Sequence, residues 1–209
     1  MERIKVKNLP LKEDIIFKAK NVLKNGGVIA LPTETVYGLV AGIFSVEGVN
    51  KVYGIKGRKQ DKPLPILLPR IDSVYDYAEE VPEFAHKLIN KFWPGPLTVI
   101  FKKKTGLNLP FDSVSLGFRI PDHPVPLSLL KTCGAVVSTS ANISGGRDAV
   151  NAEDVVEYFG GEVDLVLDAG PSVLGIPSTV VDCSGSSPKI VREGKITYSD
   201  IKTTINKRS

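Results

Sequence analysis

Short apolar runs alternate with amphipathic helical stretches along most of this chain. The first helical stretch covers about residues 11–24, where apolar side chains recur at close to a 3.6-residue period before Gly26-Gly27 ends it. The apolar run at residues 28–31 follows and stops at Pro32, which is typical of a buried strand. Interleaving of this kind predicts a layered α/β domain with a mixed sheet.

The same patterns continue to residue 192. Further helices are expected over about residues 46–55, 83–92, 124–131 and 151–159, the last one capped by Asn151. Strands are expected over about residues 39–44, 64–68, 97–101, 114–120, 135–138, 164–168, 178–182 and 189–192. No repeat, low-complexity tract or linker divides the 209 residues, so we expect a single domain over residues 1–209.

Composition excludes several classes of protein. Hydrophobic residues make up 42% and charged residues 24%, which excludes a disordered or fibrous chain. No apolar run reaches about 18 residues, and the N-terminus lacks the apolar region of a signal peptide, so we expect a cytoplasmic protein without a membrane span. The two cysteines, Cys133 and Cys183, and the two scattered histidines form no zinc pattern. A bridge between the cysteines is not expected, because cytosolic thiols stay reduced.

The net charge of +4 fits an anionic ligand such as a nucleotide or RNA. It falls short of the strong basic stripe of a dedicated nucleic-acid-binding protein. The lysine run at residues 102–104 and the basic tail are interpreted as solvated faces, with a weak RNA contact as the minority alternative.

Hydroxyls, glycines and cations gather in six segments near the expected strand ends: residues 32–38, 56–62, 117–121, 138–145, 175–179 and 191–194. Taken one at a time, each segment can be explained as a loop that caps a helix or lies in solvent. Arg119 and Arg192 are harder to explain that way, because an arginine flanked by apolar strand residues must find anions or acceptors. Ligands of open α/β sheets lie beyond the strand ends, so together the segments predict one phosphate-binding site.

The expected site has positive charge but no obvious nucleophile or base. The positive charge of its cationic side chains is about enough to offset an ATP tetra-anion, with Mg²⁺ bridging the phosphates. These side chains are Lys56, Arg58, Lys62, Arg119 and Arg192. The chain contains no GxGxxG, P-loop or GxSxG motif. Glu34 and Asp122 are single carboxylates, open to an acid–base role or to an ordinary surface or capping role. Catalysis would rest on positioning and charge stabilisation.

Seven motifs, in this order, resemble the YrdC-like family: LPTETVYGL (31–39), KGRKQDKPLPILL (56–68), KFWPGPLTVIF (91–101), GFRIPDHP (117–124), STSANISG (138–145), LDAG…GIPSTVVD (167–182) and VREG (191–194). The resemblance covers about residues 11–196. It implies a twisted mixed sheet of about seven strands, flanked by helices, around a large positively charged cavity. It also implies the short form of the family, without a second C-terminal domain.

The resemblance implies an activity as well. Proteins of this kind act as nucleotidyltransferases that combine L-threonine, bicarbonate and ATP into L-threonylcarbamoyl-AMP, releasing pyrophosphate and water. A downstream transferase then moves the threonylcarbamoyl group to adenosine-37 of tRNAs that read ANN codons. Weak binding of tRNA or other RNA fits this role.

The resemblance carries roles over to matching positions. Expected contacts to L-threonine are Thr35, Arg119, Ser138 and Ser178, with Arg119 facing the carboxylate. Expected contacts to the nucleotide are Arg58, Lys62, Ser115, Ser140, Asn142 and Arg192. Lys56 and Arg58 are the expected catalytic residues, with Lys56 close to the reacting phosphate, and Thr33 is expected to order its loop. Mg²⁺ is expected to arrive with ATP and to take no protein ligand.

The sequence departs from the family pattern at one place, and two alternative functions are left open. Many relatives carry Asn-Pro-Leu after the KxR motif and a histidine a few residues on, whereas here Lys62 precedes the Pro-Leu pair and Leu67 takes the place of the histidine. This puts one threonine or carbamate contact in question. The first rival is a non-catalytic RNA-binding factor of the same fold that acts in ribosome or tRNA maturation. The second is a relative of hydrogenase-maturation carbamoyltransferases, which normally carry further modules.

Overall fold

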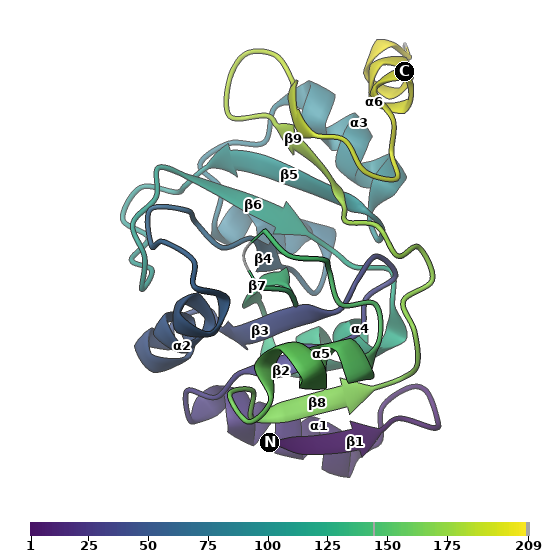
Figure 1. Ribbon diagram of the computed structural model, residues 1–209. Helices are drawn as coiled ribbons and strands as arrows, with labels where there is room; N and C mark the ends of the chain where they lie inside the picture. Colours follow the sequence, from purple (N-terminus) through teal and green to yellow (C-terminus); the bar gives the residue numbers. More distant parts are fainter. Residues whose placement is uncertain (144, 208–209) are drawn as a thin grey trace.

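The computed structural model describes residues 1–143 and 145–207. One ten-stranded sheet runs through it, in the order β1-β8-β2-β3-β7-β4-β6-β5-β9-β10 (Figure 1). The strands are β1 (Glu2–Lys5), β2 (Ile29–Leu31), β3 (Gly38–Gly42), β4 (Ile66–Leu67), β5 (Leu97–Lys102), β6 (Ser115–Arg119), β7 (Val136–Ser140), β8 (Leu165–Asp168), β9 (Thr179–Asp182) and β10 (Lys189–Arg192). The helices are α1 (Glu13–Lys24), α2 (Val46–Lys56), the 3₁₀ helix η1 (Ile71–Asp76), α3 (Glu83–Phe92), α4 (Pro124–Cys133), α5 (Ala152–Phe159) and α6 (Tyr198–Asn206).

Parallel and antiparallel pairs share this sheet. Strands β2 and β8 are parallel, as are β5 and β9, whereas β3 pairs antiparallel with β7 and β6 pairs antiparallel with β5. Strand β8 stands second in the sheet and β9 stands ninth. The connection between them, residues 169–178, therefore runs across the molecule from one end of the sheet to the other (Figure 1).

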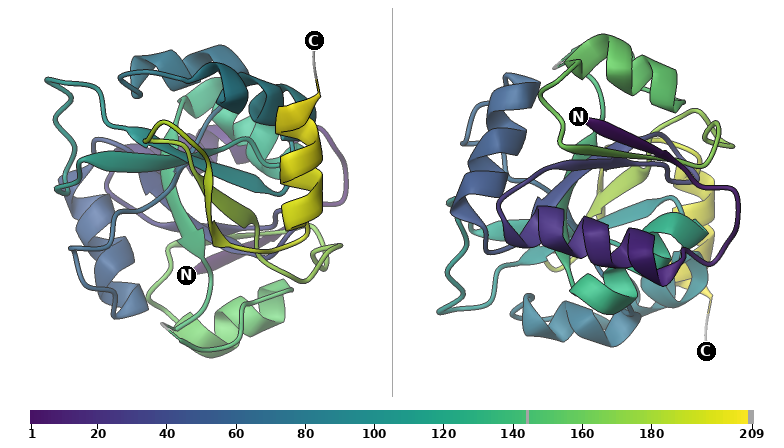
Figure 2. Two further views of the ribbon diagram at one scale, coloured as in Figure 1. Left: turned by 90° about the horizontal axis from the view of Figure 1, so that it is seen from above. Right: turned by 90° about the horizontal axis from the view of Figure 1, so that it is seen from below.

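Helices pack in pairs at the two ends of the twisted sheet. Helix α1 packs against α4, and α3 packs against α6 (Figures 1 and 2). The pair α1 and α4 covers a smaller apolar cluster that includes Leu31, Val40 and Leu129. The larger core lies under α2, α3 and α5. Burial of apolar area in these two cores supplies the main favourable term for folding.

Alternation along β5, β6 and β9 gives the sheet a polar patch opposite the larger core. Val99, Phe118 and Val181, one from each strand, belong to the large core. The neighbouring positions in β5 and β6, including Thr98 and Arg119, line a cavity instead. Successive side chains of a strand point to opposite faces, so these strands have a core face and a cavity face.

The expected fold class is confirmed: the chain is an α/β structure with a mixed sheet and flanking helices. The expected number of about seven strands is wrong, because the sheet has ten. Strand β1 was not expected, since its sequence ERIK shows no clear apolar alternation. It is an edge strand and pairs in parallel only with β8, so a single neighbour satisfies it.

The chain also contains helices that the periodicity did not predict. Helix α6 begins at Thr197, whose hydroxyl accepts from the backbone N–H of Asp200 in a reciprocal capping box. That signal is visible in the sequence, but only Ile201 and Thr204 of this helix are buried. Within the described residues, no helix is long and apolar enough to cross a membrane.

Gly194, the last residue of the VREG motif, allows two backbone segments to meet. A Cβ atom at this position would lie 2.3 Å from the carbonyl oxygen of Pro177 and 2.8 Å from the backbone nitrogen of Thr179. The N–H of Gly194 donates to the hydroxyl of Thr179 at 2.9 Å, and that hydroxyl donates to the carbonyl of Ile196 at 2.7 Å. The VREG segment is thereby fixed against the segment that enters β9.

We expect Gly194→Ala to lower the free energy of unfolding by about 1–3 kcal/mol, because the added methyl group overlaps rigid backbone. Chemical denaturation measures the change. Gly54→Ala is the matched control, since nothing lies within 4 Å of that position in α2. The control should gain about 0.5–1 kcal/mol from helix propensity. Equal stability of the Gly194 variant and the parent chain would contradict the close contact.

Candidate active site

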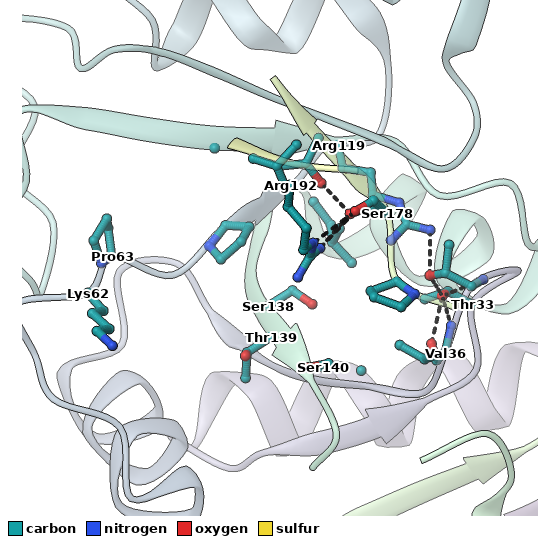
Figure 3. Close-up of a pocket in the computed structure, with 18 of the residues that line it drawn as sticks. Thr33, Val36, Lys62, Pro63, Arg119, Ser138, Thr139, Ser140, Ser178 and Arg192 are labelled. Atoms are coloured by element: carbon teal, nitrogen blue, oxygen red, sulfur yellow. Dashed lines mark hydrogen bonds between the residues drawn. The ribbon is translucent and has the colours of Figure 1, made fainter. Parts of the chain in front are cut away.

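A cavity of about 430 Å³ opens on the cavity face of β5 and β6 (Figure 3). Its walls also come from the PTET loop (residues 32–35), the segment after α2, the end of β7 and Arg192. Nine of the eleven residues expected at the site line it: Thr35, Arg58, Lys62, Ser115, Arg119, Ser138, Ser140, Ser178 and Arg192. These residues come from widely separated segments, and the sheet order brings them together.

The remaining two, Lys56 and Asn142, lie behind the cavity wall. Lys56 ends α2 and is 4% exposed. Its Nζ donates to the carbonyl oxygen of Ser140 at 2.7 Å and to Oδ1 of Asn142. The Ser140 hydroxyl also donates to Oδ1 of Asn142, at 2.8 Å, and Nδ2 of Asn142 donates to the carbonyl of Gly146 at 2.8 Å. Lys56 therefore holds the SxN motif (Ser140-Ala141-Asn142) from the protein side.

Arg58 organises the short loop that follows α2. Its Nε donates to the carbonyl of Lys62 at 3.1 Å, and its Nη2 donates to the carbonyl of Pro63 at 3.1 Å. Partial burial lowers the pKa of Arg58, although a guanidinium stays charged at any physiological pH. The loop thus carries a fixed positive charge, and the exposed Lys62 adds a second.

Thr33 orders the PTET loop as expected. Its Oγ1 donates to the carbonyl of Val36 at 2.7 Å and accepts from the backbone N–H of Thr35 at 3.2 Å. The hydroxyls of Thr33 and Thr35 lie 2.8 Å apart. The Thr35 hydroxyl in turn accepts from Nη2 of Arg119 at 2.9 Å. The loop is therefore built by its own threonines and attached to β6.

Arg119 is buried at the end of β6 with an exposed fraction of 8%. Its Nε donates to the carbonyl of Gly95 at 3.1 Å, and its Nη2 lies 2.8 Å from Oε1 of Glu34. Burial lowers the pKa of Arg119, and the charge of Glu34 opposes that shift. The sequence-based requirement that this arginine find anions or acceptors is met by the charge of Glu34 and by the acceptor oxygens of Thr35 and Gly95.

Arg192 reaches the cavity from β10 and holds Ser178. Its Nη2 donates to the carbonyl of Ser178 at 2.9 Å and to the hydroxyl at 3.2 Å. The Ser178 hydroxyl lies 2.8 Å from that of Thr98. Figure 3 shows Arg192 and Ser178 joined near the centre of the cavity, with Thr33 on one side and Lys62 on the other.

Sequence reasoning missed several residues of the cavity wall, including Thr98, although it placed Gly117 in one of the expected segments. Thr98 and Gly117 form part of its floor, where a Cβ on Gly117 would lie 3.2 Å from Cγ2 of Thr98. Thr98 could have been noticed as the only polar residue in the apolar run 97–101. Leu67 also lines the cavity, so the departure from the family pattern falls inside the site. Glu34 is no surface or capping residue, because 9% of it is exposed and it faces Arg119.

The walls offer little to hold a metal ion directly. In residues 1–143 and 145–207, no group of three or more His, Cys, Asp or Glu side chains is suitably placed. Asp61 contributes a carboxylate to the cavity wall, close to Arg58 and Lys62.

The pKa of Lys56 is lowered to about 8, mainly by burial and also by the nearby charge of Arg58, while the charge of Asp148 opposes the shift. The unfolded chain keeps a lysine pKa near 10.5, so between pH 8 and 10.5 the unfolded state binds more protons than the folded state. We expect the free energy of unfolding to rise with pH in this window, by up to about 1.4 kcal/mol per pH unit.

A comparison of the parent chain with Lys56→Met isolates the contribution of Lys56 to the pH dependence of the free energy of unfolding. Denaturant titrations at several pH values should show the parent gaining stability relative to the variant as the pH rises above 8. Below pH 8 the difference between the two should be constant. Parallel curves throughout would mean that the Lys56 amine titrates as it does in water.

Known proteins resemble this chain over most of its length. The family model Sua5/YciO/YrdC, described as telomere recombination, matches residues 21–194. The threonylcarbamoyl-AMP synthase of Bacillus subtilis (strain 168) is 37% identical over 194 residues, which cover 91% of this chain and 56% of that protein. The threonylcarbamoyl-AMP synthase of Pyrococcus abyssi is 34% identical over 195 residues. The chain thus spans little more than half the length of these two relatives.

Solved structures of similar proteins share the fold. The crystal structure of P. abyssi Sua5 complexed with L-threonine matches with a TM-score of 0.90 and 31% identity, over 98% of this chain and 60% of that one. E. coli YciO matches with a TM-score of 0.82 and 25% identity, over 93% of this chain and 95% of that one. The fold is therefore found in chains of this length and in longer ones.

Proposed function

This chain belongs to the Sua5/YciO/YrdC family, and we propose from that premise that it is an L-threonylcarbamoyl-AMP synthase. Its substrates would be L-threonine, bicarbonate and ATP. Its products would be L-threonylcarbamoyl-AMP, pyrophosphate and water.

The observation that carries the proposal is the distribution of charge within one cavity. Arg58, Lys62 and Arg192 line it, and within the described residues none of them is part of an ion pair. Unpaired cations suit a polyphosphate, which brings its own negative charge. Arg119 lies beside the PTET loop and already has a carboxylate partner. This arrangement supports separate subsites for ATP and for threonine.

The reaction would proceed in two steps. The free amine of threonine attacks the carbon of bicarbonate, and water leaves, which gives a carbamate. A carbamate oxygen then attacks the α-phosphorus of ATP; the new P–O bond forms as the bond to the β-phosphate oxygen breaks, and pyrophosphate leaves. The side chains of this cavity would contribute by orienting the reactants and neutralising charge.

Each set of side chains has a place in this scheme. Arg119 would bind the threonine carboxylate through Nη1, which donates to no other described residue. Thr35, Ser138 and Ser178 would complete that subsite, and Arg58, Lys62, Ser115, Ser140 and Arg192 would bind the nucleotide. Lys56 and Asn142 would act from behind, by holding the SxN motif in place. Mg²⁺ bound to the phosphates would neutralise part of their charge.

The product would serve tRNA modification in the cytoplasm. A downstream transferase would move the threonylcarbamoyl group to adenosine-37 of ANN-decoding tRNAs, and the excess positive charge of this chain would allow a weak contact with RNA.

Pyrophosphate release tests the proposed reaction. With ATP and Mg²⁺ present, we expect release only when both threonine and bicarbonate are added, and weak release when serine replaces threonine. Absence of release in every combination, from protein shown to be folded, would contradict the synthase function. RNA binding with a steep salt dependence would then favour the RNA-binding alternative.

Arg58→Ala and Arg119→Ala test the residue roles. Each should reduce turnover to background, because each removes a fixed charge from one subsite. Circular dichroism is expected to show a folded protein in both cases, although Arg119→Ala should be less stable than the parent chain because it leaves the buried carboxylate of Glu34 without its counter-charge. Near-normal turnover by either variant would mean that the role assigned to that arginine is wrong.

A further inference from the structure

The carboxylate of Glu34 is held in an unusual way. Glu34 and Arg119 are 9% and 8% exposed, and Oε1 of Glu34 lies 2.8 Å from Nη2 of Arg119. Within the described residues, however, neither oxygen of this carboxylate accepts a hydrogen bond of good geometry, and both are enclosed. A buried polar group without hydrogen bonds is costly and calls for an explanation. Glu34 thus supplies Arg119 with charge more than with hydrogen bonding.

The other cations of the cavity have no such compensation. Arg58, Lys62 and Arg192 form no ion pair in residues 1–143 and 145–207. Burial lowers the pKa values of Arg58 and Arg192, and the charges of Asp61 and Asp148 oppose these shifts without forming an ion pair within the described residues. Among the described residues, Arg119 is therefore the one cation of the cavity that has an ion-pair partner, although it lies close enough to Arg192 for their positive charges to repel each other.

This difference separates two kinds of ligand. A ligand with excess negative charge gains by binding beside the unpaired cations. Beside Arg119 the same ligand would also lie close to the buried negative charge of Glu34, which disfavours it. A zwitterionic α-amino acid carries a carboxylate and an ammonium group and has no net charge. It matches the neutral pair of Arg119 and Glu34, with the free Nη1 of Arg119 available to its carboxylate.

We propose that Glu34 is a specificity-determining residue, which offsets the positive charge around Arg119 so that this subsite favours a zwitterionic amino acid over an anion of the same shape. The inference rests on the proposed function, because it concerns how the threonine subsite chooses its ligand. Glu34 acts through the field around Arg119 and does not touch the ligand, since both of its oxygens are enclosed.

Calorimetric titration with two compounds tests the inference without turnover. The first is L-threonine. The second is 2,3-dihydroxybutanoate of the same stereochemistry, in which a hydroxyl replaces the ammonium group and leaves a net anion. We expect the parent chain to bind threonine at least about tenfold more tightly. If the parent binds both compounds equally, the inference is wrong and the proposed function stands. If it binds neither, both are wrong.

Glu34→Gln keeps the shape of the side chain and removes its charge. We expect the preference for threonine to shrink at least severalfold, mainly because the hydroxy acid gains affinity. Glu162→Gln, at an exposed position after α5, removes the same charge elsewhere and should behave like the parent. An unchanged preference in Glu34→Gln, or an equal loss of affinity for both compounds, would overturn the inference, the latter because it would mean that Glu34 only positions Arg119.

Glu34→Asp keeps the negative charge and should retain most of the preference. If Glu34→Gln does not fold, as judged by circular dichroism, the parent chain and the aspartate variant still decide the question. Loss of the preference in a folded aspartate variant would indicate that the geometry of the contact, and not its charge, selects the ligand.

Discussion

A buried guanidinium needs a counter-charge, and much of this cavity is arranged around that requirement at Arg119. The residue ends a strand whose neighbouring side chain, Phe118, lies in the apolar core. Alternation along β6 therefore forces the guanidinium onto the opposite face, next to the PTET loop. The loop supplies the acceptor hydroxyl of Thr35 and the carboxylate of Glu34. Without these partners the burial of Arg119 would cost several kcal/mol, so the loop and the strand depend on each other.

Elsewhere in the site, several side chains also act by holding other residues in place. Lys56 holds the SxN motif from inside the protein, Thr33 builds the PTET loop, and Arg192 fixes Ser178. Gly194 lets the VREG segment approach the backbone that carries Ser178. Several motif residues thus shape the cavity walls, and the side chains that we expect to meet ligands are those of Arg58, Lys62 and Arg192 together with the free edge of Arg119. Preorganisation of this kind suits a reaction that lacks an obvious protein nucleophile.

The sequence predicted the class of fold and most of the site, for physical reasons that also explain the misses. Periodicity located α2 and α3 closely, because both helices bury a regular apolar face. It missed β1 and α6, whose few buried residues leave a weak pattern. The motifs brought nine expected residues to one cavity. They left open whether Glu34 is a surface residue, because its burial depends on β6, about 80 positions away in the chain. They likewise could not show that Lys56 faces the SxN motif from behind.

We propose that one cavity holds two subsites that differ in charge. A crystal structure of the chain with L-threonine and a non-hydrolysable ATP analogue tests it most directly. We expect the threonine carboxylate to bind Nη1 of Arg119, and the polyphosphate to lie among Arg58, Lys62 and Arg192. Phosphate oxygens bound to Arg119, or threonine bound at the Lys62 end of the cavity, would contradict it.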